Sequence, residues 1–286
     1  MEGCGVIEAL VGGDREARVS AAREVIEMAS RQRQKLAEKG VIAPLILMMG
    51  RGEDEGVVGV ALYALLSLAF GSERNKVRIV KCGAVPVLCE MLGSSGSLTL
   101  MEQAVTGLMI LSSCSANKAT IAASGAVQLL ADILGCGCYL SEQAKLDAIS
   151  TLHNLSTCPH LIPTLVSSGV VSVMVGVLFE SDKCSEMAEK AAELVEKLVS
   201  SDGGALQERG GGAQIKARSC SELRKRIGRL VWWSTKLSGK TLARDLMNLI
   251  RSAVGESERV PDGSDPDRTR GGLCCWICGL GQDLSG

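Results

Sequence analysis

The sequence predicts an all-α protein, built as a right-handed superhelix of stacked helical repeats. A marker of glycine, a small residue and an apolar run recurs along the chain, with its glycines at positions 40, 83, 125 and 169, so that the steps are 43, 42 and 44 residues. The core must also be filled by aliphatic side chains, because 46% of the 286 residues are hydrophobic but only seven are aromatic. A period in the forties is typical of helical solenoids, in which each unit buries its apolar face against its neighbours.

Each unit is expected to contain three helices in a fixed order. A helix of about ten residues follows the glycine, as in residues 84–92, where Pro86 stands in the first turn and its missing N–H costs least. A polar loop then leads to a longer helix, in which a small alanine is followed four and seven residues later by Leu or Val, so that the three side chains form one apolar stripe. The stripes are Ala61/Leu65/Leu68, Ala104/Leu108/Leu111, Ala148/Leu152/Leu155 and Ala191/Val195/Leu198. A short third element leads to the next glycine.

The repeat array is expected to span residues 14–201. A shorter unit begins it, with Ala22, Ile26 and Ala29 in its longer helix. Residues 1–13 are expected to form an N-terminal extension, residues 202–254 a degenerate repeat that ends as an irregular cap, and residues 255–286 a disordered tail that contains cysteines.

The twelve cysteines are interpreted as free thiols in a reducing compartment. Cys82, Cys89, Cys114 and Cys184 lie inside apolar helical patterns, where a thiol acts as a small hydrophobic side chain. The N-terminal residues lack the basic and then apolar pattern of a signal peptide, and no apolar run has the length of a transmembrane helix. We therefore expect a soluble protein of the cytoplasm, the nucleus or both.

Three segments of the chain resemble a known family. "AAREVIEMASRQRQKLAEKGVIAPLI", "NKVRIVKCGAVPVL" and "AISTLHNLS" are similar to armadillo repeats, above all to those of plant proteins that often join such an array to a U-box ubiquitin-ligase domain. The resemblance covers residues 14–201, and the U-box itself is not expected in this chain. It implies a non-catalytic scaffold or substrate-recognition module in ubiquitin-dependent signalling. The partner it implies is a protein or an extended peptide in the concave groove.

By this resemblance, the longer helices line the groove. Nuclear-import adaptors of the same family carry Trp two residues after the small alanine and Asn four residues later. The Trp positions hold Tyr63, Thr106, Ser150 and Glu193, and the Asn positions hold Ser67, Ile110, Asn154 and Lys197. An import-adaptor role is therefore disfavoured, because only Asn154 fits. These eight residues and His153 are the predicted partner contacts, with ordinary solvated surface as the alternative. Lys76 and Arg78 are expected to lie outside the groove, where their replacement should have little effect.

The sequence gives no basis for an enzyme, a cofactor or a metal site. Paired carboxylates, nucleophile–base sets and metal-ligand spacings are missing, and His153 and His160 are the only two histidines. The segment around Gly239, Lys240 and Thr241 lacks the first glycine of a phosphate-binding loop. A net charge of −1 does not favour nucleic acid as a partner. The sequence leaves the oligomeric state open.

Residues 216–240 leave a second function open. They hold eight Lys or Arg and one acid, which gives +7, and their apolar residues fall on one helical face. Such a helix can bind acidic lipid or a calmodulin-like groove, so the alternative function is a peripheral membrane or calmodulin-type effector. The competing interpretation is a C-terminal cap whose apolar face covers the last repeat.

Overall fold

The computed structural model describes residues 2–50, 54–93, 97–136, 140–181 and 185–200. Every regular element in these ranges is helical, and none of them contains a strand. The α-helices are α1 (Glu2–Gly12), α2 (Arg15–Lys39), α3 (Ile42–Met49), α4 (Glu55–Ala69), α5 (Glu73–Lys81), α6 (Ala84–Gly93), α7 (Leu98–Ser112), α8 (Lys118–Ala123), α9 (Ala126–Gly135), α10 (Glu142–Ser156), α11 (Ile162–Ser167), α12 (Val170–Glu180) and α13 (Glu186–Ser200). Short 3₁₀ turns, Ser115–Asn117 and Pro159–Leu161, precede α8 and α11.

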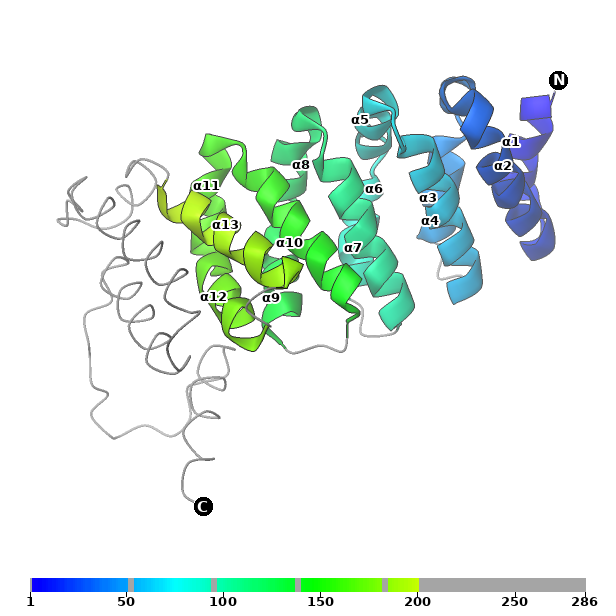
Figure 1. Ribbon diagram of the computed structural model, residues 1–286. Coiled ribbons are helices and arrows are strands. Elements are labelled where there is room, and N and C mark those ends of the chain that lie inside the picture. The colour runs from blue at the N-terminus through cyan, green and yellow to red at the C-terminus, as the bar shows by residue number, and fades with distance from the viewer. Residues whose placement is uncertain (1, 51–53, 94–96, 137–139, 182–184, 201–286) are drawn as a thin grey trace, which may run out of the picture.

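The helices stack in rows along the array (Figure 1). The longer helices α2, α4, α7, α10 and α13 form one row, in which each contacts the next. The helices α3, α6, α9 and α12 form a second row in the same order. The short helices α5, α8 and α11 lead from each longer helix to the following helix of the second row. The predicted all-α solenoid is confirmed.

The repeat glycines form the corners at which the second-row helices begin. Their φ angles are 94° at Gly40, 91° at Gly83, 85° at Gly125 and 74° at Gly169. A side chain at these positions would be strained, because glycine alone adopts positive φ without steric cost. The period of the sequence marker therefore reports one recurring backbone corner.

The predicted apolar stripes fill the space between the rows. None of their twelve side chains is more than 4% exposed. In the first unit Ala22 and Ala29 are buried as expected, but Ile26 is only partly buried and Val25 is fully buried instead. The position predicted for Ile26 in the stripe is therefore wrong by one residue. It lies in α2, which continues through a kink at Gln32 (φ −134°) directly into the next short helical segment.

The residues predicted as an N-terminal extension contain a helix that packs on the array. Val6 and Leu10 of α1 are buried, and α1 contacts both α2 and α3. The predicted cap at residues 202–254, the tail at residues 255–286 and the basic segment 216–240 lie outside the described residues.

Some cysteines behave as predicted and others do not. Cys89 and Cys114 are buried, and burial raises the pKa of both thiols, so each stays a protonated, small hydrophobic side chain. Cys82 is exposed just after α5, which corrects its assignment to the core. Cys136 is disulfide-bonded, so the expectation of free thiols does not hold throughout. Cys184 lies outside the described ranges.

A ladder of cations joins consecutive units at the C-terminal ends of the longer helices. Each cation donates to the residue that follows the next longer helix in the row. The pairs are Arg33 Nη1 to the carbonyl oxygen of Phe70, Lys76 Nζ to Ser113 Oγ (2.7 Å) and Lys118 Nζ to Thr157 Oγ1 (2.5 Å). A cation in this place also interacts favourably with the negative end of the helix dipole. Both lysines are buried. Lys76 is therefore a structural contact, and the expectation that its replacement would have little effect is corrected.

Replacing Lys118 by Met should lower the free energy of unfolding by about 1–3 kcal/mol, because the change keeps the aliphatic stem but removes a buried charge-assisted hydrogen bond. Urea unfolding followed by circular dichroism measures the loss. The matched control is Lys35→Met in α2, where the side chain is exposed and the change should be nearly neutral. Equal losses in the two variants would contradict a stabilising role for the ladder.

Among the described helices, no single one is both long enough and apolar enough to cross a membrane. One pair of segments meets both conditions jointly, Pro159–Ser167 with Val170–Leu178, and these are bent by 74° at the break between them.

Candidate functional site

A groove of about 790 Å³ opens along the row of longer helices, over α2, α4, α7 and the start of α10. Four of the nine predicted partner contacts line it, namely Tyr63, Ser67, Thr106 and Ile110. The groove therefore lies on the face that the repeat register selected, and it spans the first three longer helices.

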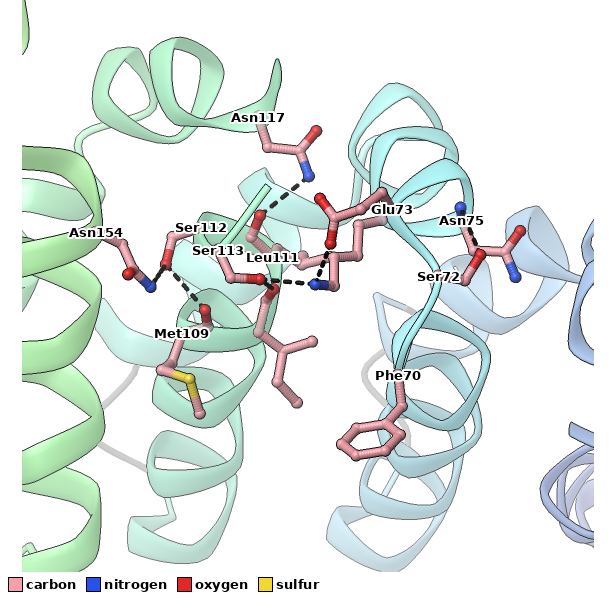
Figure 2. Close-up of polar contacts among 12 residues, drawn as sticks. Phe70, Ser72, Glu73, Asn75, Met109, Leu111, Ser112, Ser113, Asn117 and Asn154 are labelled. Atoms are coloured by element: carbon pink, nitrogen blue, oxygen red, sulfur yellow. Dashed lines mark hydrogen bonds and ion pairs between the residues drawn. The ribbon is translucent and has the colours of Figure 1, made fainter. Parts of the chain in front are cut away.

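One wall of the groove is apolar and aromatic. Tyr63 is 62% exposed and Phe70 is 69% exposed, in a protein with only seven aromatic residues. Leu66, one helical turn from each of them, lines the same wall. Ser67 adds little polarity, because its Oγ donates to the carbonyl oxygen of Tyr63 at 2.8 Å. Figure 2 shows the Phe70 ring standing clear of the polar contacts at the helix ends.

The side of the groove formed by α7 and α10 carries hydroxyl and amide groups, and Thr106 and Gln143 contact a carboxylate, Asp147, that lies outside the groove lining. Thr106 Oγ1 donates to Asp147 Oδ2 at 2.7 Å, and Gln143 Nε2 donates to Asp147 Oδ1 at 2.9 Å. Both Asp147 oxygens therefore accept hydrogen bonds, and the buried carboxylate ties α7 to α10. Gln103 differs, because its Oε1 is buried and has no hydrogen-bond partner in the part of the chain that the structure describes. This oxygen lies against Gly59 of α4, where an added Cβ would be 3.3 Å from it.

The sequence interpretation missed Phe70, Gln103 and Asp147. The last two stand directly before the small alanine of their units, which places them on the groove face, and this position could have been read from the repeat. Phe70 could not be found in this way, because the equivalent residues of the next units, Ser113 and Thr157, are small and polar.

The other five predicted contacts lie on α10 and α13, beyond the lining of this groove. Asn154 Nδ2 donates to Ser112 Oγ at 3.0 Å, and Ser112 Oγ donates to the carbonyl oxygen of Met109 at 2.9 Å (Figure 2). Asn154 thus links α10 to α7, and the amide nitrogen of its side chain already makes a hydrogen bond within the protein. Ser150 Oγ accepts from Lys190 Nζ at 3.3 Å. The side chain of Glu193 is exposed.

His153 lies half-buried among charged side chains. Burial lowers its pKa, Lys197 lowers it further, Glu193 opposes the change, and Lys118 and Lys190 add smaller lowering effects. Neither the imidazole ring of His153 nor the ammonium of Lys197 has a hydrogen-bond or ion-pair partner among the residues with described positions. This end of the row is therefore polar and carries charges of both signs, whereas the groove end is apolar.

The described ranges contain no group of three His, Cys, Asp or Glu side chains placed to hold a metal ion. What the site offers is contact surface: an aromatic wall, the side-chain amide of Gln103 and, further along the row, a mixture of lysine, glutamate and histidine side chains.

Comparison with known sequences finds plant relatives. No protein-family model matches the chain. U-box domain-containing protein 7 of Arabidopsis thaliana is 29% identical over 173 residues, which are 59% of this chain and 21% of that protein. U-box domain-containing protein 45 of the same plant is 28% identical over 173 residues, which are 59% of this chain and 22% of that protein. The chain thus spans about a fifth of the length of these curated relatives.

Comparison with solved structures finds designed repeat proteins. A designed armadillo repeat protein in complex with the peptide (KR)4 matches with a TM-score of 0.65 and 20% identity, over 85% of this chain and 97% of that one. The chain therefore has the armadillo-repeat fold, and its repeats are similar in sequence to part of the plant U-box domain-containing proteins.

Proposed function

We propose that the groove over α2, α4 and α7 binds an extended segment of another protein, so that the chain acts as a non-catalytic interaction scaffold. The observation that carries this proposal is the exposure of Tyr63 and Phe70 on one wall of the groove. Large exposed aromatic side chains are enriched among the residues that dominate binding energy, because they bury much surface and lose little conformational entropy.

The polar side of the groove supports a peptide backbone as the ligand. Gln103 lines the groove from α7, and a side-chain amide can both donate to and accept from the backbone of an extended segment. The long, open shape of the groove, lined from three consecutive longer helices, also suits a chain that runs along the row. The designed armadillo protein solved with the peptide (KR)4 supports a ligand of this kind.

The finer proposal is that the bound segment belongs to a protein handled in ubiquitin-dependent signalling. Its support is the sequence similarity to the U-box domain-containing proteins 7 and 45 of Arabidopsis thaliana. In this proposal the chain recognises a substrate or assembles a complex, in the cytoplasm, the nucleus or both. A fluorescent fusion in plant cells tests the location, and co-capture of a ubiquitin ligase tests the pathway.

Replacing Tyr63 and Phe70 together by Ala should lower the affinity for a captured partner at least about tenfold, because each change removes an exposed aromatic anchor. The melting temperature should change little, since neither side chain is buried. Capture from a plant extract identifies the partner by mass spectrometry, and titration of the purified partner gives the affinity.

Two control variants separate this function from its alternative. Val11→Ala with Leu47→Ala removes exposed apolar side chains from α1 and α3, away from the groove lining, and should leave affinity unchanged. Lys225→Glu with Arg226→Glu weakens the basic segment 216–240. If the Lys225 and Arg226 variant loses partner capture while the Tyr63 and Phe70 variant keeps it, the peripheral membrane or calmodulin-type effector is favoured instead.

A further inference from the structure

We propose that residues 229–237 of the same chain occupy the groove in cis, with Trp232 and Trp233 against its aromatic wall, so that a partner binds by displacing this segment. The inference rests on the proposed function, because it concerns the same groove, and it adds a competitor that the chain itself carries. Residues 229–237 lie outside the described residues. Three observations support this occupant: where the aromatic residues are, where the described array ends, and how charge is distributed.

The exposed aromatic side chains of the groove wall match an aromatic pair further along the chain. Tyr63 and Phe70 are mostly exposed on the wall. The tryptophan pair directly follows residues 230–231, Leu and Val, so that four large apolar residues stand in a row. Indole rings pack favourably against phenyl and phenol rings, and such a contact removes apolar surface of both partners from water. The tryptophan pair is therefore a chemical match for the wall.

The described array ends at the same edge of the groove face at which Phe70 stands. Ser200, the last residue of α13, is equivalent to Phe70 in the repeat, because positions 70, 113, 157 and 200 follow each other at steps of 43, 44 and 43 residues. The longer helices α4, α7, α10 and α13 contact one another in this order (Figure 1). Packed helices lie about 8–10 Å apart, so the three steps from Ser200 back to Phe70 correspond to about 24–30 Å.

The chain between Ser200 and the tryptophan pair has the length to cover this distance. Trp232 comes 32 residues after Ser200. A flexible coil of that length has a root-mean-square end-to-end distance of about 28–34 Å, and a continuous helix would reach about 48 Å. A tether whose length matches the span gives its end an effective concentration of about 1 mM at the groove. A contact with a dissociation constant of about 100 µM would then fill about nine-tenths of the grooves in cis.

The charges of the two parts of the chain have opposite signs. Residues 216–240 carry +7, whereas residues 1–200 hold 17 Lys or Arg and 22 Asp or Glu, which gives −5. Among the described residues that line the groove, Glu102 is charged and none is Lys or Arg. Arg229 and Lys236, which flank the tryptophan pair, therefore meet a carboxylate and no cation in this lining. Opposite net charges also favour the encounter of the two parts over longer distances.

The tryptophans report on their own docking in the full-length chain. All three tryptophans of the protein, at positions 232, 233 and 276, follow the described array, and Trp276→Phe leaves the pair as the only emitters. In that background, Tyr63→Ala with Phe70→Ala should shift the tryptophan emission to longer wavelength and increase its quenching by acrylamide. The reason is that the indole rings leave an apolar wall for water.

The matched control for this measurement is Val11→Ala with Leu47→Ala, which removes exposed apolar side chains away from the groove lining. It should leave the emission and the quenching as they are in the parent. Tryptophan emission that is already typical of water in the parent would overturn the inference. So would emission from an apolar site that does not respond to Tyr63→Ala with Phe70→Ala, which is the result that a cap on the last unit would give.

A fluorescein-labelled peptide of residues 226–240 measures the competition directly. It should bind the full-length Trp232→Ala, Trp233→Ala chain at least about tenfold more tightly than the parent chain, because the parent groove is occupied in cis. The further changes Tyr63→Ala and Phe70→Ala should weaken this binding at least about tenfold. Equal affinities of the parent and of the tryptophan variant for the peptide would overturn the inference.

The occupant in cis and the proposed function can fail separately. If the tryptophan emission does not depend on Tyr63 and Phe70 but the capture of other proteins does, the occupant is rejected and the proposed function stands. If the emission depends on these two residues and no captured protein does, the groove is an interface within the chain and the proposed function is rejected.

Discussion

Replacing Leu152 by Ala is expected to lower the free energy of unfolding by about 2–5 kcal/mol. Leu152 is fully buried in α10, which packs against both α7 and α13. Leu108 holds the equivalent position in α7, between α4 and α10, and the same loss is expected there. The cost is high because neighbours on both sides hold the surrounding helices in place, so the cavity left by the missing atoms cannot collapse fully.

Urea unfolding followed by circular dichroism measures this loss, with Leu98→Ala as the matched control. Leu98 is the first residue of α7 and is 51% exposed, so the same chemical change should cost less than about 0.5 kcal/mol. If Leu152→Ala lowers the free energy of unfolding by no more than Leu98→Ala does, the longer helices do not form the core.

The repeat made the fold predictable. Every copy of the marker meets the same two requirements, a backbone corner with positive φ and an apolar stripe facing the neighbouring unit, so each copy reinforces the interpretation of the others. Among the described units, the wrong register at Ile26 falls in the one whose longer helix runs through a kink, at Gln32, into the next helical segment. There the local sequence departs from its copies, and periodicity carries less information.

The candidate site was only half predictable. The repeat register found Tyr63, Ser67, Thr106 and Ile110 in the groove, because a position within the unit determines the face of the helix. It could not find which polar side chains pair with each other. Asn154 was expected to be free for a ligand, but it binds Ser112, 42 residues earlier, and that pairing depends on how closely two units pack.

The repeated pair Asn–Lys shows what the sequence did contain. It occurs at residues 75–76 and again at residues 117–118, at the start of the third element of two units. In both units the lysine reaches forward to the next longer helix, while the asparagine reaches back to a carbonyl oxygen of its own longer helix, Leu68 for Asn75 and Leu111 for Asn117. A polar pair repeated at the unit period inside an apolar pattern indicates this structural role.

Asn75→Ala is expected to destabilise the protein by about 1–3 kcal/mol, because the fully buried Nδ2 donates to the carbonyl oxygens of Leu68 (2.9 Å) and Arg33 (3.2 Å), and both would lose this donor. Asn117→Ala is the matched comparison, since Asn117 Nδ2 makes one such bond, to Leu111 at 3.1 Å, and its loss should be smaller. Asn75→Asp should cost more than Asn75→Ala, because it places a carboxylate against two carbonyl oxygens. Unfolding free energies in urea give the order, and an Asn75→Asp variant as stable as the parent would contradict the donor role of Asn75.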